Sequence, residues 1–142
     1  MEGANSISKT LVSVVLVERP IEDVWGYWIG SASIKQWNIP FDDWHCPTVT
    51  NDFREGGQFN FRMERIEDGE GFDYRGVYDH IIPLEYIEST SGGRNCIVEF
   101  QALDNNTIIR ETFEADTITP LDLQQKFTDS VLGNFKKFAE SR

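Results

Sequence analysis

The chain has 142 residues and a formal net charge of -11, with 39 % hydrophobic and 26 % charged residues. This length suits one domain with its own core, and the composition is that of a globular protein rather than a disordered one. The acidic balance, without clusters of Lys and Arg, argues against nucleic acid or an anionic membrane as a partner, because both attract basic residues. We therefore expect a single domain over residues 1–142.

Cysteine usage and the N-terminus bear on the cellular compartment. Cys46 and Cys96 have neither CxxC spacing nor histidines at ligand spacing, so we expect free thiols and no metal site. The opening residues 1–8 contain no basic residue of the kind that begins a secretory signal. The apolar run 11–17 is far too short to span a bilayer. These features favour a cytoplasmic protein.

The first predicted elements are one strand and two short helices. Residues 9–18 form a Val-rich run that is typical of a strand. Pro20 then favours the first position of a helix, which ends at Gly30. The apolar stripe of this helix, at helical spacing, consists of Ile21, Val24, Trp25 and Trp28. A second helix is expected after Ser31, and it stops before Asn38.

The middle of the chain alternates with a period of two, which is typical of β-strands. Turns rich in Gly, Asn and Asp separate the alternating runs, and they are short enough to join antiparallel neighbours. The pattern therefore predicts an antiparallel meander. Its strands lie near 44–53, 57–66, 71–82, 84–91, 94–103 and 106–116.

Alternation also predicts which side chains share one face of this sheet. They are Phe59, Phe61, Met63, Phe72, Tyr74, Gly76, Tyr78, His80, Cys96, Val98, Phe100, Ile109, Glu111 and Phe113. A bulge near residues 81–83 would reverse the far end of the 71–82 strand. Glu111 stands out on this face, because a buried carboxylate needs a partner, a proton or water. The arginines Arg62, Arg75 and Arg110 point to the opposite face.

The last predicted element is a helix that covers this face. Thr119 is the expected N-cap and Pro120 the first helical residue. About twenty residues at ~1.5 Å each make a rod of roughly 30 Å, enough to cross a whole sheet. The apolar stripe comprises Leu123, Phe127, Val131, Phe135 and Phe138. Gln124, Thr128 and Asn134 lie within or beside it, which a purely structural seam would seldom require.

Several local sequences resemble the START/SRPBCC superfamily, in the branch related to the heat shock protein 90 ATPase activator. In chain order they are IEDVWGYWIGSASIKQWN, WNIPFDDW, NDFREGGQFNFRME, DGEGFDYRGVYD, STSGGRNCIVEF, TIIRETFEAD and NFKKFAE. The resemblance runs from about residue 8 to residue 140. It implies the helix-grip fold of class α+β: a curved antiparallel sheet of about seven strands wrapped on a long C-terminal helix, with two short helices between the first two strands.

The resemblance also implies an apolar cavity between sheet and helix that binds a small hydrophobic or aromatic molecule. On the side of the sheet and short helices, its walls would be Trp37, Phe41, Trp44, Phe61, Met63, Tyr74, Tyr78 and Phe100. On the side of the long helix they would be Phe127, Val131 and Phe135. Glu111, Thr128 and Asn134 complete the predicted binding set as polar groups that orient the ligand.

The long helix departs from the pattern of the relatives. They usually carry Gly-Trp where this chain has Phe127-Thr128, so a large ring has moved by about 100° around the helix. The shape of the cavity therefore differs, and the identity of the ligand cannot be transferred from them.

Two structural readings and three functions stay open at this point. The aromatic face suits a filled core as well as a container, because Phe, Tyr and Trp dominate cores by area. We favour a binding protein without a cofactor, a monomer or homodimer. The first alternative is an enzyme acting on a cyclic or polyketide-like substrate, as the polyketide cyclases of the superfamily do, with Glu111 as the candidate acid-base residue beside Tyr74 or Tyr78. The second is a domain that docks on a chaperone.

Motifs of several enzyme classes are missing from the sequence. It contains no Gly-x-Ser-x-Gly elbow, no HExxH and no phosphate-binding or dinucleotide-binding glycine motif. The pair Gly56-Gly57 precedes a predicted strand rather than a helix, so it cannot place a phosphate on a helix dipole.

Overall fold

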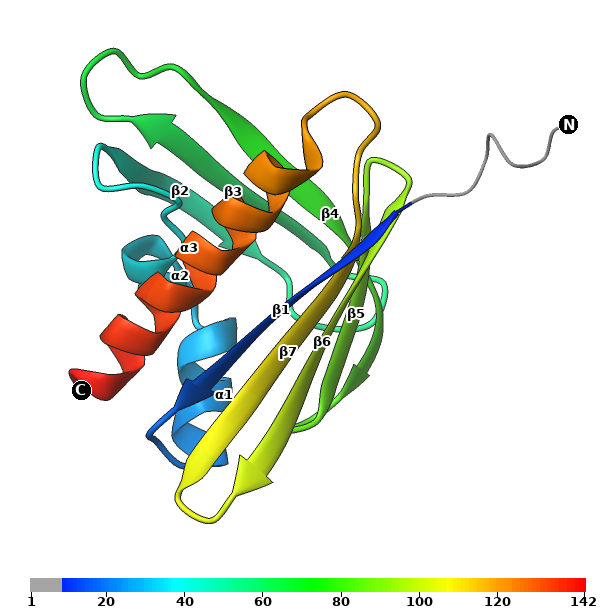
Figure 1. Cartoon of the computed structure of the whole chain (residues 1–142). Helices are drawn as coiled ribbons and strands as arrows, with labels where there is room; N and C mark the ends of the chain where they lie inside the picture. Colours follow the sequence, from blue (N-terminus) through cyan, green and yellow to red (C-terminus); the bar gives the residue numbers. More distant parts are fainter. Residues whose placement is uncertain (1–8) are drawn as a thin grey trace, which may run out of the picture.

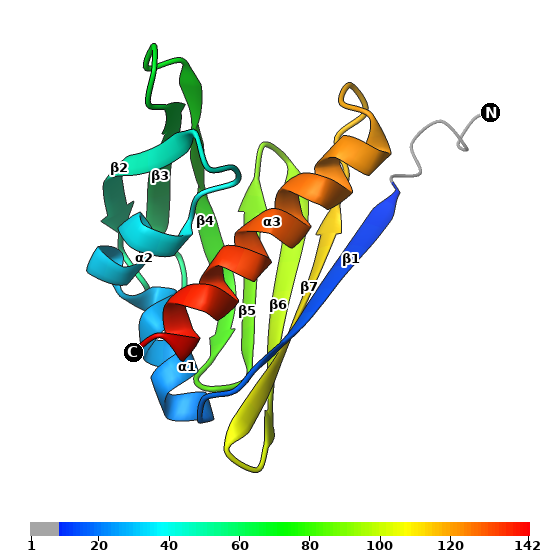
Figure 2. The same ribbon diagram turned by 60° about the vertical axis from the view of Figure 1, so that its left-hand side comes forward.

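The computed structural model describes residues 9–142 (Figures 1 and 2). Seven strands form one antiparallel sheet in the order β1-β7-β6-β5-β4-β3-β2. Their bounds are β1 Thr10–Val17, β2 Trp44–Asn51, β3 Gln58–Arg65, β4 Gly71–Ile82, β5 Tyr86–Ser91, β6 Arg94–Leu103 and β7 Asn106–Glu114. The strands β2 to β7 follow each other as a meander, and β1 joins the sheet beside β7.

Three helices complete the fold: α1 Ile21–Ile29, α2 Ser31–Trp37 and α3 Leu121–Glu140. The sheet curls around α3, which lies diagonally across its concave face (Figure 2). The C-terminal half of α3 lies near α1 and α2, while its first turns lie at the opposite end of the sheet. The α+β helix-grip fold and its predicted elements are thereby confirmed.

The densest packing lies where α1, α2 and the C-terminal half of α3 meet the sheet. Phe135 of α3 is 0 % exposed and makes edge-to-face contacts with Trp28 and Trp37, with ring centroids 5.0 and 4.9 Å apart. Phe100 of β6 meets Trp25 and Trp28 at 5.2 and 5.6 Å. Such aromatic pairs stabilise a core beyond the area they bury.

The start of α3 differs from the prediction. Pro120 is the N-cap, and Thr119 makes no capping hydrogen bond with its side chain. Instead the Gln124 amide accepts from the backbone N–H of Asp116 at 2.9 Å and donates to the carbonyl of Thr119 at 2.7 Å. The Asp116 carboxylate accepts the N–H groups of Ile118 and Thr119. The predicted Thr119 cap is therefore wrong, because Asp116 and Gln124 bind the backbone groups of this turn instead.

The buried stripe of α3 is also shifted toward the C-terminus. Val131 and Phe135 are buried as predicted, and Leu132 and Ala139, which the predicted stripe did not include, are buried too. Leu123, predicted to belong to the stripe, is 52 % exposed. It lies in the first turn of α3, far from the end where α1 and α2 pack against this helix (Figure 2).

A bulge in β4 changes which side chains face inward. The pairing of β4 with β5 shifts between Tyr78 and His80, so that Asp79 is an extra residue. Beyond it, Ile81 lies opposite the buried Ile87, while His80 is exposed. The prediction that His80 shares a face with Tyr78 is therefore wrong, because the bulge comes before His80 rather than near residues 81–83.

Candidate functional site

The predicted binding residues separate into a packed group and a partly open group. The packed group, with no more than 9 % exposure for any member, comprises Trp37, Met63, Tyr78, Phe100, Val131 and Phe135. The partly open group comprises Phe41, Trp44, Phe61, Tyr74, Glu111, Phe127, Thr128 and Asn134. The structure thus places about half of the predicted set in a filled core.

In the packed group, the polar atoms of the aromatic side chains have partners inside the protein. The Tyr78 hydroxyl donates to Asn51 Oδ1 at 2.6 Å, and Asn51 in turn donates to the carbonyl of Ile29 at 3.0 Å. The indole N–H of Trp37 donates to the carbonyl of Tyr27 at 2.9 Å. Burial is the main reason why the pKa of Tyr78 is raised above its ordinary value. The hydrogen-bond donors of these two side chains are therefore already used within the protein.

At the other end of α3, four rings form an aromatic rim: Phe41, Trp44, Phe72 and Phe127. Phe127 of α3 meets Phe41 and Phe72 with ring centroids 6.2 and 6.0 Å apart, and Trp44 meets Phe72 at 6.1 Å. Phe41 and Phe72 are 38 % and 40 % exposed. The predicted binding set omitted Phe72, although its alternation with Tyr74 had placed it on the inner face.

Three side chains on the inner face of the sheet form an inner polar cluster: Tyr74 of β4, Cys96 of β6 and Glu111 of β7. The Cys96 thiol donates to Glu111 Oε2 across 3.5 Å. Burial is the first cause of a raised pKa in all three groups, and it brings the pKa of Glu111 to about 7. Near pH 7 this carboxyl group can therefore both give and take a proton.

Within the described residues 9–142, no basic side chain pairs with the carboxyl group of the inner polar cluster. Apart from burial, the one influence on the pKa of Glu111 is the hydrogen bond from Cys96. The Tyr74 hydroxyl has no hydrogen-bond partner among residues 9–142, and the residue as a whole is half-buried. On β1, Ser13 lies opposite Glu111 and donates its hydroxyl to Asp129 of α3. The cluster is thus acidic and retains unused hydrogen-bonding capacity.

Asn134 and Thr128 take different positions on α3. The Asn134 side-chain amide donates to the carbonyl of Ile39, which holds the loop after α2 against α3. Thr128 is half-buried one residue after Phe127. The predicted ligand contact of Asn134 therefore competes with a structural hydrogen bond.

Two hollows open on the surface, and the first of them borders the rim residue Trp44. One, of about 400 Å³, is lined by Gln36, Ile39, Asp42, Trp44, Asn134, Lys137, Phe138 and Ser141. The other, of about 470 Å³, lies on the outer face of the sheet and is lined by Pro47, Thr48, Thr50, Asn60, Arg62, Glu64 and Asp73. Neither is lined by a member of the inner polar cluster.

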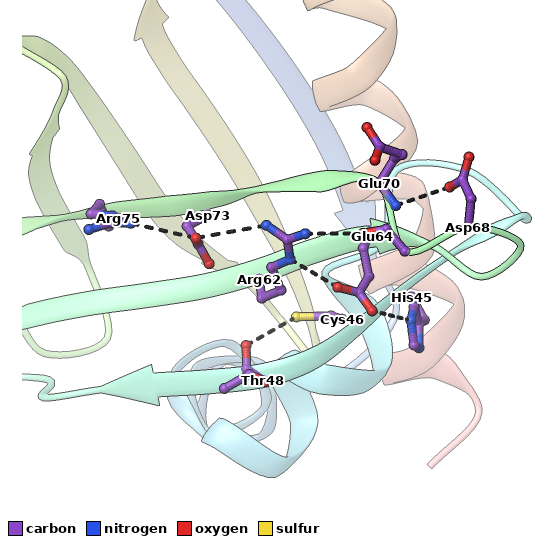
Figure 3. A network of polar contacts seen from close by, with 10 residues as sticks. His45, Cys46, Thr48, Arg62, Glu64, Asp68, Glu70, Asp73 and Arg75 are labelled. Carbon is purple, nitrogen blue, oxygen red and sulfur yellow. Dashed lines mark hydrogen bonds and ion pairs between the residues drawn. The ribbon is translucent and has the colours of Figure 1, made fainter.

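Figure 3 shows a chain of ion pairs along β2, β3 and β4. Three of its residues, Arg62, Glu64 and Asp73, line the outer hollow. Glu64 accepts from Arg62 at 2.9 Å and lies 3.1 Å from His45 Nε2. Asp73 lies 3.8 Å from Arg62 and 3.5 Å from Arg75. The hydrogen bond from Arg62 is the main cause that lowers the pKa of Glu64, and the hydrogen bond with His45 lowers it less. Each charged side chain in this network has a neighbour of opposite charge. We therefore interpret the network as part of the surface structure rather than as a binding site.

The structure also bears on metals and membranes. Within residues 9–142, no group of three or more His, Cys, Asp or Glu side chains is placed to hold a metal ion. None of the helices in this part of the chain is both long and apolar enough to cross a membrane.

Solved structures with the same fold come from several bacteria. An AHSA1-like protein from Aeromonas hydrophila has a TM-score of 0.88 and 28 % identity, with 94 % of this chain and 93 % of that one covered. A protein from Cytophaga hutchinsonii has a TM-score of 0.76 and 33 % identity, with coverage of 94 % and 92 %. A Chromobacterium violaceum protein shares only the fold, with a TM-score of 0.82, 15 % identity and coverage of 92 % and 96 %.

Comparisons of sequence agree with this result. No curated protein matches the chain. The family model described as "Activator of Hsp90 ATPase homolog 1-like protein" matches residues 18–140, which is most of the chain. The two neighbours with the higher identities share the helix-grip architecture along more than nine-tenths of their length. The chain therefore belongs to the Activator of Hsp90 ATPase homolog 1-like family, within the START/SRPBCC superfamily.

Proposed function

We propose that this protein binds a small apolar or aromatic molecule between the sheet and the N-terminal half of α3. The observation that carries the proposal is that the residues of the inner polar cluster are deeply placed but not fully buried. Tyr74, Cys96 and Glu111 lie deep enough for burial to dominate their pKa values, yet each keeps some accessible surface. Deep side chains with accessible surface are expected where an internal space meets the core.

The aromatic rim supports the proposal from the outside. Its rings come from α3, from β4, from the first residue of β2 and from the segment before β2, and Phe72 lies two residues before Tyr74 on the same face of β4. Partly exposed aromatic rings beside a few polar groups are typical of sites for small molecules. A ligand would lay its apolar body against Phe72 and Phe127 and direct a polar end toward Tyr74.

A thermal-shift screen of apolar and aromatic compounds tests this function. A compound at one hundred times its dissociation constant adds about 2.7 kcal/mol to the unfolding free energy. Such a gain raises the melting temperature of a domain of this size by roughly 5 to 15 °C. Thr128→Trp should fill the space and abolish the shifts, whereas Lys126→Trp, on the exposed side of α3, should keep them. If the melting temperature still rises with both substitutions, the compound binds elsewhere. If no compound of a broad screen raises the melting temperature of the parent protein, the proposal is contradicted.

Acid-base catalysis in the same place is a second proposal. A carboxyl group with a pKa of about 7 suits proton transfer near neutral pH, and Tyr74 offers a second proton donor beside it. The substrate would be a cyclic or polyketide-like molecule. A compound found in the screen should then be converted by the parent protein and not by Glu111→Gln, whereas equal rates in both would remove Glu111 from the reaction.

The family description suggests a third role, as an activator-type domain that docks on a heat shock protein 90 in the cytoplasm. Mixing the purified protein with the chaperone of the same cell and measuring its ATPase rate tests this role directly. An unchanged rate at saturating protein would count against it.

A further inference from the structure

We propose that the molecule bound at this site carries a protonated amine, which pairs with Glu111, on an aromatic body that lies against the rim. This inference rests on the proposed function and adds the chemical class of the ligand.

The polar groups that lie opposite or contact Glu111 on the neighbouring strands are neutral. β1 contributes Ser13, opposite Glu111, and α3 contributes the Asp129 carboxylate that Ser13 binds. β6 contributes the Cys96 thiol, and β4 contributes the Tyr74 hydroxyl. An anionic ligand would therefore meet the carboxyl group of Glu111 among neutral neighbours.

Basic groups nearby are directed elsewhere. Arg94, at the start of β6, lies 4.0 Å from the Asp116 carboxylate, and its effect on the pKa of Tyr74 is the smallest of those that act there. No basic residue contributes to the pKa of Glu111. A buried carboxylate without a cation is unfavourable, and a cationic ligand that replaces its proton removes this penalty.

The remaining groups fit the shape of an aromatic amine. The Tyr74 oxygen, free of partners among residues 9–142, can accept a hydrogen bond from an ammonium group held by Glu111. The rings of Phe72 and Phe127, 6.0 Å apart, offer apolar surface to a ring system on the side toward solvent. A molecule with a flat apolar body and one cationic end therefore matches the aromatic rim with its body and the inner polar cluster with its charge.

Three compounds with one shared body test the inference: 2-naphthylmethylamine, 2-naphthylmethanol and 2-naphthoic acid. Titration calorimetry at pH 7.5 should show the amine binding at least about tenfold more tightly than the alcohol, and the acid more weakly than both. At pH 6.5 the amine should release protons from Glu111, which makes its binding heat depend on the ionisation enthalpy of the buffer.

Two variants that each remove one negative charge separate the site from the acidic surface. Glu111→Gln should abolish the preference for the amine and the proton release. Glu99→Gln removes an exposed carboxylate from the outer face of the same sheet region and should leave both intact. Equal losses in the two variants would show general attraction to a protein of net charge -11 and overturn the inference.

The outcomes also separate this inference from the proposed function. Equal binding of amine and alcohol, or tighter binding of the acid, would overturn the amine and leave the binding site standing. If none of the three compounds binds, the inference fails together with the proposed container for aromatic molecules of this size.

Discussion

Under its C-terminal half, α3 presses Phe135 against Trp28 and Trp37 without leaving any of the Phe135 side chain accessible. Under its N-terminal half, the same helix carries Phe127, which touches the partly exposed rings of Phe41 and Phe72. The sequence uses phenylalanine at both ends, so residue type does not tell a filled core from an open site. The two ends differ in what covers them, because α1 and α2 lie beside the C-terminal half of α3 and not beside its first turns (Figure 2).

The largest expected effect comes from truncating one phenylalanine at each end of α3. Phe135→Ala should lower the unfolding free energy by about 3–5 kcal/mol, because it leaves a cavity in a packed core. Phe127→Ala should cost no more than about 1.5 kcal/mol, because its ring lies in the partly open rim. Urea denaturation measures both values, and equal losses would show that the two ends are packed alike.

Glu111→Gln should stabilise the protein in alkaline solution. The folded-state pKa of about 7 lies above the ordinary value of 4.5, so the unfolded chain loses this proton first. The loss of stability that comes from burying the charged carboxylate is therefore absent below about pH 4.5, increases as the pH rises to 7, and is complete above 7. At pH 8 the variant should gain on the order of 1–3 kcal/mol over the parent, and none at pH 4.5. Denaturation curves at both pH values check this, and a difference independent of pH would contradict the burial of Glu111.

Two tyrosines on β4 give a smaller contrast. Tyr78→Phe removes a donor from Asn51 Oδ1 and should cost about 1 kcal/mol. Tyr74→Phe breaks no hydrogen bond within residues 9–142, so it should change the unfolding free energy by less than about 0.5 kcal/mol while weakening any ligand bound in the site. A larger loss for Tyr74→Phe would indicate a buried partner for this hydroxyl.

The smallest effect is expected at the first turn of α3. Leu123→Gln should change the unfolding free energy by less than about 0.5 kcal/mol, because the leucine is 52 % exposed. Thermal unfolding against the parent measures it. A loss of several kcal/mol would mean that this turn packs against something in solution.

Alternation and turn chemistry were enough to predict the strands and the order of the elements. The inner face of β6, with Cys96, Val98 and Phe100, follows directly from a period of two. The place of the bulge in β4 was not predictable, because one extra residue at Asp79 leaves the composition of the strand unchanged. The same holds for the start of α3, which long side chains rather than a local cap hold in place.

Prediction of the site was limited by packing. Parity correctly placed Glu111 and Tyr74 on the inner face, and the carboxyl group on an apolar face was the useful signal. Parity could not tell that Tyr78 meets Asn51 while Tyr74, four residues earlier, has no partner in the described part of the chain. That difference arises because Asn51, at the end of β2, reaches the Tyr78 hydroxyl, and spacing along β4 does not encode such a tertiary contact.

The pairing of β1 with β7 has a consequence for how the protein is made. Thr10 of β1 lies opposite Glu114 of β7, so the first strand finds its place in the sheet only after most of the chain has been synthesised. Until then β1 presents an apolar, unpaired edge of the kind that attracts other chains. Contacts between such distant segments also slow folding. The newly synthesised protein should therefore depend on protection at the ribosome until residues 106–114 have emerged.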